Sequence, residues 1–132
     1  MSTVLIVDDT EANRRLTGMV LHKAGYTIQV ARDGIEALKM ISQERPDLVL
    51  IDLHMPRMNG WELSQYLKSD ADLHAIPLIA LTGYNNLSDA AEYSSANWAG
   101  YISKPFDIDD LVETVQQLIG VQPYLLSLTA TS

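Results

Sequence analysis

The stretch Val4-Leu5-Ile6-Val7-Asp8-Asp9 decides the fold, because four consecutive apolar residues lead directly into two carboxylates. A strand this apolar, with no polar alternation, is buried on both faces, which is typical of a parallel sheet covered by helices. A second apolar run, Leu48-Val49-Leu50-Ile51, also ends in a carboxylate, Asp52. The carboxyl ends of the strands in such a sheet open onto one edge, where ligands bind. We therefore expect these three carboxylates to meet in one crevice.

Two later apolar segments also lead to polar groups. Ile79-Ala80-Leu81 is followed by Thr82, and Tyr101-Ile102 is followed one residue further on by Lys104. Lys104 is the only Lys or Arg in residues 69–132, against eight Asp and Glu. A single lysine is usually a solvated surface charge, but its position between an apolar strand and a proline favours a role in the site. Carboxylates, a hydroxyl and an ammonium together predict a phosphate and divalent-cation site.

Strand and helix signals alternate five times along the chain. The expected strands are residues 3–7, 26–31, 47–51, 76–81 and 99–102. Five helices are expected, beginning near Thr10, Asp33, Gly60, Ser88 and Asp107. Short connections between such units imply right-handed crossovers and helices on both faces of one sheet. The fold class is therefore α/β, with a doubly wound, five-stranded parallel sheet.

The apolar spacing predicts which side chains of the helices face the sheet. In the first helix, the residues at helical spacing are Ala12, Leu16, Met19, Val20 and Lys23. In the third helix, the repeating residues are Leu63, Tyr66 and Leu67.

The chain of 132 residues has the size of one globular domain. It contains no cysteine, so disulfides and thiolate metal sites are excluded. The first strand begins at once, which leaves no room for a signal peptide, and no apolar run approaches the length of a membrane span. We expect a cytoplasmic protein with no membrane insertion and one domain, residues 1–120. Residues 121–132 form an uncharged tail, and no output domain is expected.

The net charge of −8 is unevenly distributed. Residues 1–68 carry eight Lys and Arg against nine Asp and Glu. In residues 69–132, Lys104 is the only basic residue against eight Asp and Glu. Binding to nucleic acid requires a basic face that neutralises phosphates. The charge pattern therefore argues against a nucleic-acid partner.

The clustered acids suggest how the site would work. A like-charged pair costs about 4 kcal/mol at about 4 Å and an effective dielectric of about 20. A hard divalent cation relieves this repulsion, and an all-oxygen site with spare water positions suits magnesium. One carboxylate can then act as a nucleophile toward a phosphoryl group. Such transfer needs in-line placement and neutralised charge on the equatorial oxygens, for which Lys104 and the Thr82 hydroxyl are candidates.

These motifs, in this order and at this spacing, resemble the receiver domains of two-component response regulators. The resemblance covers residues 3–119 and is carried by four segments: Asp8-Asp9, Asp52-Leu53-His54-Met55-Pro56-Arg57-Met58-Asn59-Gly60, Thr82-Gly83 and Tyr101-Ile102-Ser103-Lys104-Pro105-Phe106. It implies the flavodoxin-like strand order 2-1-3-4-5.

The resemblance also implies a role for each site residue. Asp52 would be the phosphoacceptor, and Lys104 would bind the phosphate. The peptide bond between Lys104 and Pro105 would be cis. Thr82 and Tyr101 would form the switch pair. The magnesium ligands would be the carboxylates of Asp8, Asp9 and Asp52 and the backbone carbonyl of His54.

The chain departs from the family pattern at four positions. Asn97 stands in place of the usual glycine at the end of the fourth helix, and Trp98 replaces a small residue, so its indole must displace that helix or lie exposed. His54 and Tyr84 flank the expected phosphate, and neither is small or acidic. A phenol offers bulk without a carboxylate to orient water, which predicts slow self-dephosphorylation.

The function expected is that of a single-domain response regulator. It would take a phosphoryl group from a histidine kinase or phosphotransfer protein onto Asp52 and catalyse only its own phosphorylation and dephosphorylation, without acting as an enzyme on other substrates. Its output would be a contact with a downstream protein. The face formed by the fourth and fifth helices is acidic, so copies would repel and a monomer or weak dimer is expected.

Two other classes of protein fit less well. A haloacid-dehalogenase-type phosphatase also uses aspartate and magnesium, but its motif is Asp-x-Asp, whereas Asp52 is followed by Leu53-His54. A flavin or dinucleotide module needs a glycine-rich turn after the first strand, where this chain has Asp8-Asp9.

Overall fold

The computed structural model describes residues 2–53, 59–82, 98–103 and 107–120. Five strands form one parallel sheet in the order β2-β1-β3-β4-β5, which confirms the flavodoxin-like order expected from the sequence. Their bounds are Thr3–Val7 for β1, Thr27–Ala31 for β2, Leu48–Asp52 for β3, Leu78–Thr82 for β4 and Gly100–Ser103 for β5. These bounds differ from the expected ones by no more than two residues.

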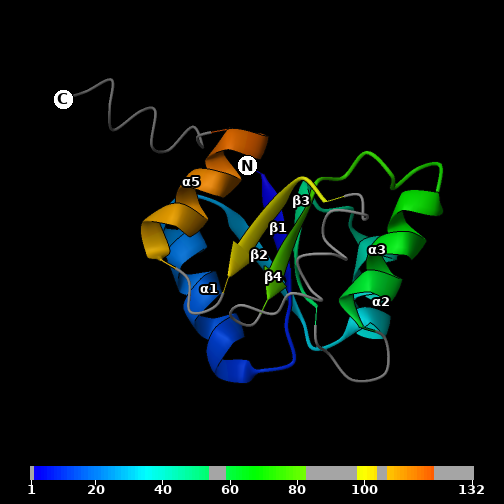
Figure 1. Ribbon diagram of the computed structural model, residues 1–132, viewed down its shortest axis with the longest axis horizontal. Helices are drawn as coiled ribbons and strands as arrows, with labels where there is room; N and C mark the ends of the chain where they lie inside the picture. Colours follow the sequence, from blue (N-terminus) through cyan, green and yellow to red (C-terminus); the bar gives the residue numbers. More distant parts are fainter. Residues whose placement is uncertain (1, 54–58, 83–97, 104–106, 121–132) are drawn as a thin grey trace.

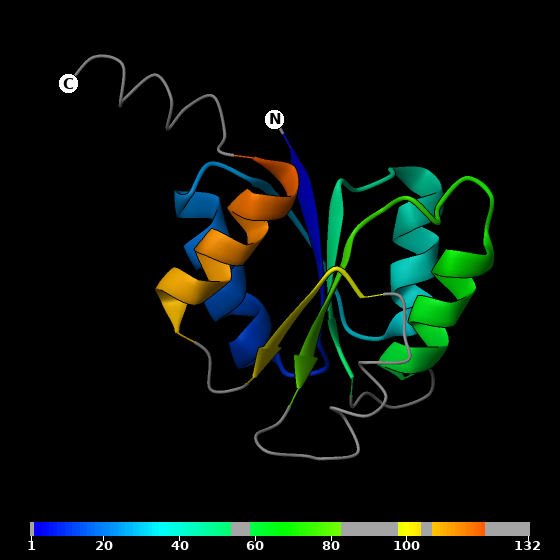
Figure 2. The ribbon, with the colours of Figure 1, turned by 45° about the horizontal axis from the view of Figure 1, so that its top comes forward.

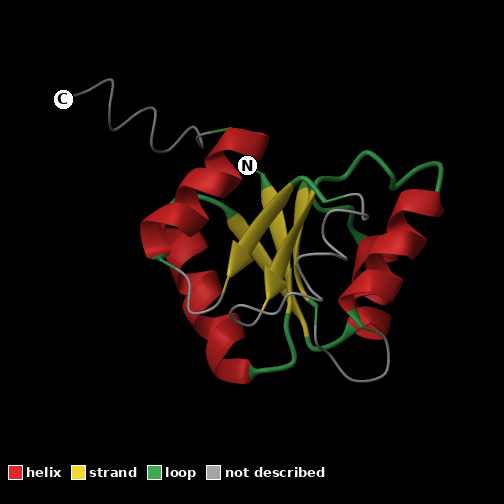
Figure 3. Ribbon diagram, viewed as in Figure 1, coloured by secondary structure: helices red, strands yellow, loops and turns green. Residues whose placement is uncertain are grey.

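The described residues form four helices that cover the two faces of the sheet (Figure 1 and Figure 3). They are α1 (Glu11–Lys23), α2 (Gly34–Gln43), α3 (Gly60–Ser69) and α5 (Ile108–Ile119). Figure 2 shows α1 and α5 together on one face, and α2 and α3 together on the other. The helix predicted to begin near Ser88 falls in residues 83–97, outside the described residues, so the fifth helix stays a prediction.

The strands supply two cores because successive side chains point to opposite faces of the sheet. In β1, Val4 and Ile6 pack with the α1 and α5 side, whereas Leu5 and Val7 pack with the α2 and α3 side. All five residues of β1 and all five of β3 are buried. Double burial explains why these strands contain no polar alternation before their terminal carboxylates.

The predicted inward face of α1 is wrong. Thr17 and Leu21 are the buried residues of this helix, whereas the side chains of Leu16 and Met19 are 47% and 58% exposed. Val20 packs beside the core as expected. Apolar residues surround much of α1, so their spacing alone does not define which face meets the sheet. The prediction for Tyr66 in α3 is also wrong, because that side chain is 53% exposed.

Two helix starts follow the expected cap chemistry, and one does not. Asp33 accepts a hydrogen bond from the backbone N–H of Glu36 (2.8 Å), and Asp107 caps α5 in the same way. Thr10 occupies the N-cap position of α1, but its side chain makes no capping hydrogen bond. The carboxylate of Asp8 instead accepts from the backbone N–H of Thr10 (2.9 Å).

Candidate functional site

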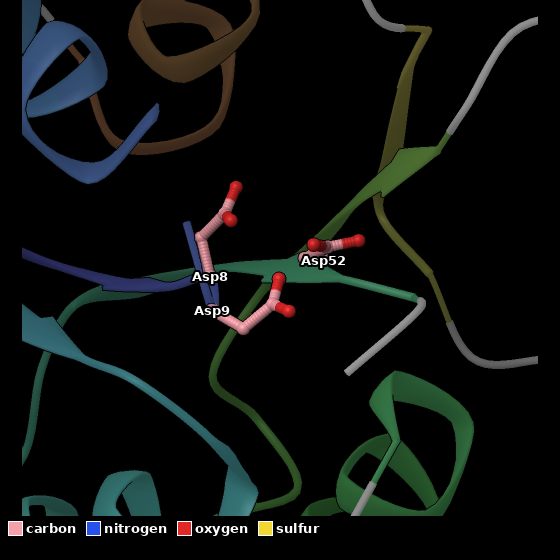
Figure 4. A group of neighbouring side chains, drawn as sticks. All are labelled: Asp8, Asp9 and Asp52. Atoms are coloured by element: carbon pink, nitrogen blue, oxygen red, sulfur yellow. The ribbon is translucent and has the colours of Figure 1, made fainter. Parts of the chain in front are cut away.

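The carboxylates of Asp8, Asp9 and Asp52 lie together at the carboxyl edge of the sheet, as Figure 4 shows. One oxygen from each lies within 4.8 Å of the others. Asp8 and Asp52 are buried, and Asp9 is exposed. The predicted meeting of these three acids is therefore confirmed. Its cause is the parallel register, in which Val7 pairs with Ile51 and the next residue of each chain segment is an aspartate.

The register also carries the next two strands to the same edge. Asp52 pairs with Leu81, so the backbone of Thr82 lies one residue beyond the partner of Asp52. Thr82 in turn pairs with Ser103 of β5. The side chain of Thr82 lies outside the described part of the chain. Tyr101, two residues before Ser103, is half-buried and pairs with Ala80.

Several predicted features lie outside the described residues. They are His54 with its backbone carbonyl, Tyr84, Asn97, and Lys104 with the cis peptide to Pro105. Their proposed roles therefore remain predictions. Trp98 is described: its side chain is half-buried and packs beside the core on the α2 and α3 face, so the indole is not fully exposed. The other alternative, displacement of the fourth helix, concerns residues outside the described ranges and stays a prediction.

Asp8 is held in place by contacts to three segments. Its backbone N–H donates to the carbonyl of Ala31 at the end of β2 (3.1 Å). Its own backbone carbonyl accepts from the guanidinium of Arg14 in α1 (2.7 Å), and its carboxylate accepts from the N–H of Thr10. These bonds orient the acid where the chain turns from β1 into α1. Arg14 was not identified from the sequence, since a helical arginine six residues after an acid gives no distinctive signal.

The start of α3 packs directly against Asp52. A Cβ added at Gly60 would lie 2.7 Å from the carbonyl oxygen of Asp52 and 2.8 Å from the Cα of Leu53. The N–H of Gly60 donates to the carbonyl of Leu53 (3.2 Å), and Asn59 forms a capping box with Glu62. Sequence reasoning noted Gly60 only as part of a motif. A glycine in the first helical turn, directly after a cap residue, was the signal for this close approach.

The chemistry of the cluster follows from its composition. Three carboxylates supply only oxygen donors, which are the ligands that hard divalent cations such as magnesium prefer. Because two of the three are buried, the protein interior cannot screen their repulsion as bulk water would. The donor set therefore fits a hard cation, and the exposed side of Asp9 leaves it open to solvent.

Residues 4–116 match the response regulator receiver domain. This chain belongs to that family. The resemblance noted in the sequence is thereby confirmed over most of the chain.

Individual relatives agree with this assignment. The chain is 35% identical over 118 residues to the polar-differentiation response regulator DivK of Brucella anthropi, and the match covers 89% of this chain and 96% of that protein. Its fold is similar to that of the chemotaxis protein CheY4 of Vibrio cholerae, with a TM-score of 0.83, 30% identity, and coverage of 89% and 98%.

A third comparison concerns the acidic cluster. The receiver domain of the sensor histidine kinase PA1611 from Pseudomonas aeruginosa PAO1 was solved with a magnesium ion coordinated in its active site cleft. It is 26% identical to this chain, with a TM-score of 0.83 and coverage of 89% of this chain and 97% of that one.

Among the helices of the described ranges, none has the length and apolar character needed to cross a membrane.

Proposed function

We propose that this receiver domain accepts a phosphoryl group on Asp52 from the phosphohistidine of a histidine kinase or phosphotransfer protein. The observation that carries the proposal is the meeting of three carboxylates from β1 and β3 at one sheet edge, with oxygens within 4.8 Å of one another. Asp52 is the acid that ends the central strand β3, and it lies beside β4 and the start of α3. It is therefore the best-placed nucleophile.

Magnesium is the cofactor that this donor set supports. The carboxylates of Asp8, Asp9 and Asp52 and the backbone carbonyl of His54 would hold the ion. The magnesium seen in the PA1611 receiver domain supports this proposal. When bound, the ion would offset the repulsion among the acids and part of the charge on the phosphoryl oxygens.

The transfer itself needs few protein groups. A carboxylate oxygen of Asp52 attacks the phosphorus, the phosphorus–nitrogen bond of the phosphohistidine breaks, and its electron pair returns to the imidazole nitrogen. The product is an acyl phosphate on Asp52. The ammonium of Lys104 and the hydroxyl of Thr82 would neutralise the remaining phosphoryl oxygens. The domain thus catalyses only its own phosphorylation and the later hydrolysis, and it does not act as an enzyme on other substrates.

The signal would leave the domain through a change of surface. Phosphorylation adds charge beside β4, and the hydroxyl of Thr82 would turn toward the new oxygens. Tyr101 on the neighbouring strand β5 would then move inward, as the register of the two strands allows. The altered surface binds a downstream protein.

The exposed start of α5 carries Asp107, Asp109 and Asp110. The like charges on this surface oppose the pairing of two copies and favour a monomer or weak dimer.

The experiment is phosphoryl labelling of the purified chain by acetyl phosphate and by phosphorylated kinases. We expect one acid-labile phosphate per chain in the presence of magnesium, and none in Asp52→Asn. Asp72→Asn, which changes an exposed carboxylate elsewhere, is the matched control and should label like the wild type. Repeated turnover of p-nitrophenyl phosphate without stoichiometric labelling would instead establish a phosphatase.

A further inference from the structure

A groove of about 360 Å³ lies beside the edge strand β2, and Arg14, which bonds to the Asp8 carbonyl, lines it. One wall is formed by residues of α1, and the other by the alternate residues Ile28 and Val30 of β2. Its lining is mostly apolar and consists of Arg14, Arg15, Gly18, Met19, His22, Ile28 and Val30. The side chains of Met19 and Val30 are 58% and 43% exposed. Met19 of α1 and Val30 of β2 thus contribute to an uncovered apolar surface.

The outer edge of β2 is a second feature of this surface that another segment could bind. β2 is the first strand in the sheet order and pairs only with β1 among the described strands. The outer edge of such a strand presents backbone N–H and C=O groups that can pair with another extended segment. An apolar groove next to an open strand edge suits a strand whose side chains alternate between apolar and polar.

The C-terminal segment of this same chain has that pattern. Residues 121–132 contain no charged residue. In extended conformation, Tyr124, Leu126 and Leu128 share one wholly apolar face, while Leu125, Ser127 and Thr129 lie on the other, which is mixed. Pro123 precedes the segment, and a proline is tolerated at the first position of an edge strand. Five residues, 124–128, also equal the length of β2.

The described chain ends close to the start of β2. The hydroxyl of Tyr26, the residue before β2, donates to the carbonyl of Gly120 (2.7 Å). Ile28, at the near end of the groove, is two residues from Tyr26 on the same face of the strand. Residues 121–124 can span about 13 Å when extended, which is enough to bring Tyr124 beside β2. A segment that enters from this end would run parallel to β2.

We propose that residues 124–128 add to the edge of β2 as a sixth parallel strand, with Tyr124, Leu126 and Leu128 in the groove beneath α1. Tethering favours this occupant over another molecule, because a short linker gives a millimolar effective concentration. The proposal holds whether or not Asp52 is the phosphoacceptor.

Disulfide trapping tests the placement in the full-length chain, which contains no native cysteine. One variant combines Met19→Cys in the groove with Leu126→Cys in the tail. The control combines Tyr66→Cys with Leu126→Cys, because Tyr66 is similarly exposed but lies on α3, on the other face of the sheet. Disulfide formation is measured in a glutathione buffer. We expect the intramolecular effective concentration of the Met19→Cys and Leu126→Cys pair to be at least tenfold higher than that of the control pair. Equal values for the two pairs, or disulfides only between chains, would overturn the proposal.

Hydrogen exchange tests the strand without introducing cysteines. Leu126→Asp places a charge on the face proposed to enter the groove, and Leu125→Asp places the same charge on the opposite face. We expect the exchange of the amides in residues 27–31 to accelerate at least tenfold in Leu126→Asp and less than twofold in Leu125→Asp. Equal effects of the two variants, or no effect of either, would contradict the proposed strand.

Discussion

The carbonyl oxygen of Asp52 lies 2.7 Å from the position that a Cβ on Gly60 would occupy. The N-terminus of α3 therefore rests on the backbone of the proposed phosphoacceptor, and no side chain fits between them. The two atoms nearest to a Cβ at this position, the Asp52 oxygen and the Leu53 Cα, belong to the backbone, and the Cγ2 atom of Ile51 follows at 3.0 Å. Relief would require α3 or the end of β3 to move, and either movement displaces the Asp52 carboxylate.

Gly60→Ala should consequently destabilise the protein and disturb the site. We expect the free energy of unfolding to fall by about 2 kcal/mol, as for other overpacked positions, and the rate of labelling by acetyl phosphate to fall with it. Gly18→Ala is the control: its Cβ would meet Ile28 at an ordinary 3.5 Å, and alanine in a helix interior gains about 0.5–1 kcal/mol over glycine. Urea unfolding of both variants measures the contrast. A loss of similar size at the two glycines would show that the close approach has no special cost.

Asp9→Asn should stabilise the metal-free protein while it weakens magnesium binding. The three acids repel one another without a cation, so neutralising one raises the free energy of unfolding by about 1 kcal/mol after solvent screening. The same change removes a proposed magnesium ligand. Thermal unfolding with a chelator, and calorimetric titration with magnesium, measure the two effects. Asp72→Asn should leave both unchanged, and a lower melting temperature of metal-free Asp9→Asn would contradict the electrostatic account.

Tyr26→Phe should loosen the end of α5. It removes the hydrogen bond from the phenol to the Gly120 carbonyl (2.7 Å), and a typical bond of this kind contributes about 1 kcal/mol to stability. Urea unfolding at neutral pH measures the loss. Tyr66→Phe, at an exposed position, should change stability by less than half as much.

The same tyrosine predicts a pH dependence. Burial raises the pKa of Tyr26 above its ordinary value of 10.0, so above pH 10.0 the native state keeps a proton that the unfolded state loses. The stabilising contribution is therefore complete below pH 10.0 and is lost as the pH rises toward the folded-state pKa. The stability difference between wild type and Tyr26→Phe should narrow over this alkaline range. If the stability difference between wild type and Tyr26→Phe stays constant or widens, the phenol ionises at least as easily in the folded chain as in the unfolded one.

Glu36 predicts the opposite behaviour in acid. Its carboxylate accepts from the backbone N–H of Arg32 (3.0 Å) and pairs with the Arg32 guanidinium (3.1 Å). The backbone hydrogen bond, followed by the side-chain hydrogen bond and the charge of Arg32, lowers the pKa of Glu36 below 4.5. Its stabilising contribution is present above pH 4.5 and disappears as the pH falls through the folded-state pKa.

Glu36→Gln should therefore cost about 0.5 kcal/mol at neutral pH, since the pair is largely exposed, and nothing in strong acid. Unfolding measured between pH 7 and about pH 3 tests the convergence. Glu113→Gln, at an exposed position on α5, is the matched control. A cost that is equally large in acid would assign the effect to packing of the side chain instead of its charge.

The sheet and the acidic cluster could be predicted because the pattern that creates them is local. An uninterrupted apolar run such as Val4–Val7 marks a strand that is buried on both faces, and the aspartate that follows each run marks its end. Parallel pairing then brings Asp8 and Asp52 to one edge with no further information. The caps at Asp33 and Asp107 are equally local, because each bonds to the helix that it begins.

Contacts between distant segments could not be predicted in this way. Leu16 and Met19 have the spacing of a buried face, yet the packing of α1 against β1, β2 and α5 turns Thr17 and Leu21 inward. The bond from Arg14 to the Asp8 carbonyl and the fit of Gly60 against Asp52 depend on how helices lie on strand ends. None of these contacts can be predicted from the spacing of apolar residues along the sequence.

Chemical trapping of the acyl phosphate shows directly whether Asp52 carries the phosphoryl group. The chain is incubated with acetyl phosphate and magnesium, the acyl phosphate is reduced with borohydride, and peptide mass spectrometry locates the resulting homoserine. We predict homoserine at position 52 alone, with none when magnesium is removed by a chelator. Homoserine at position 8 or 9, or no homoserine in a chain that has taken up phosphate, would contradict the account.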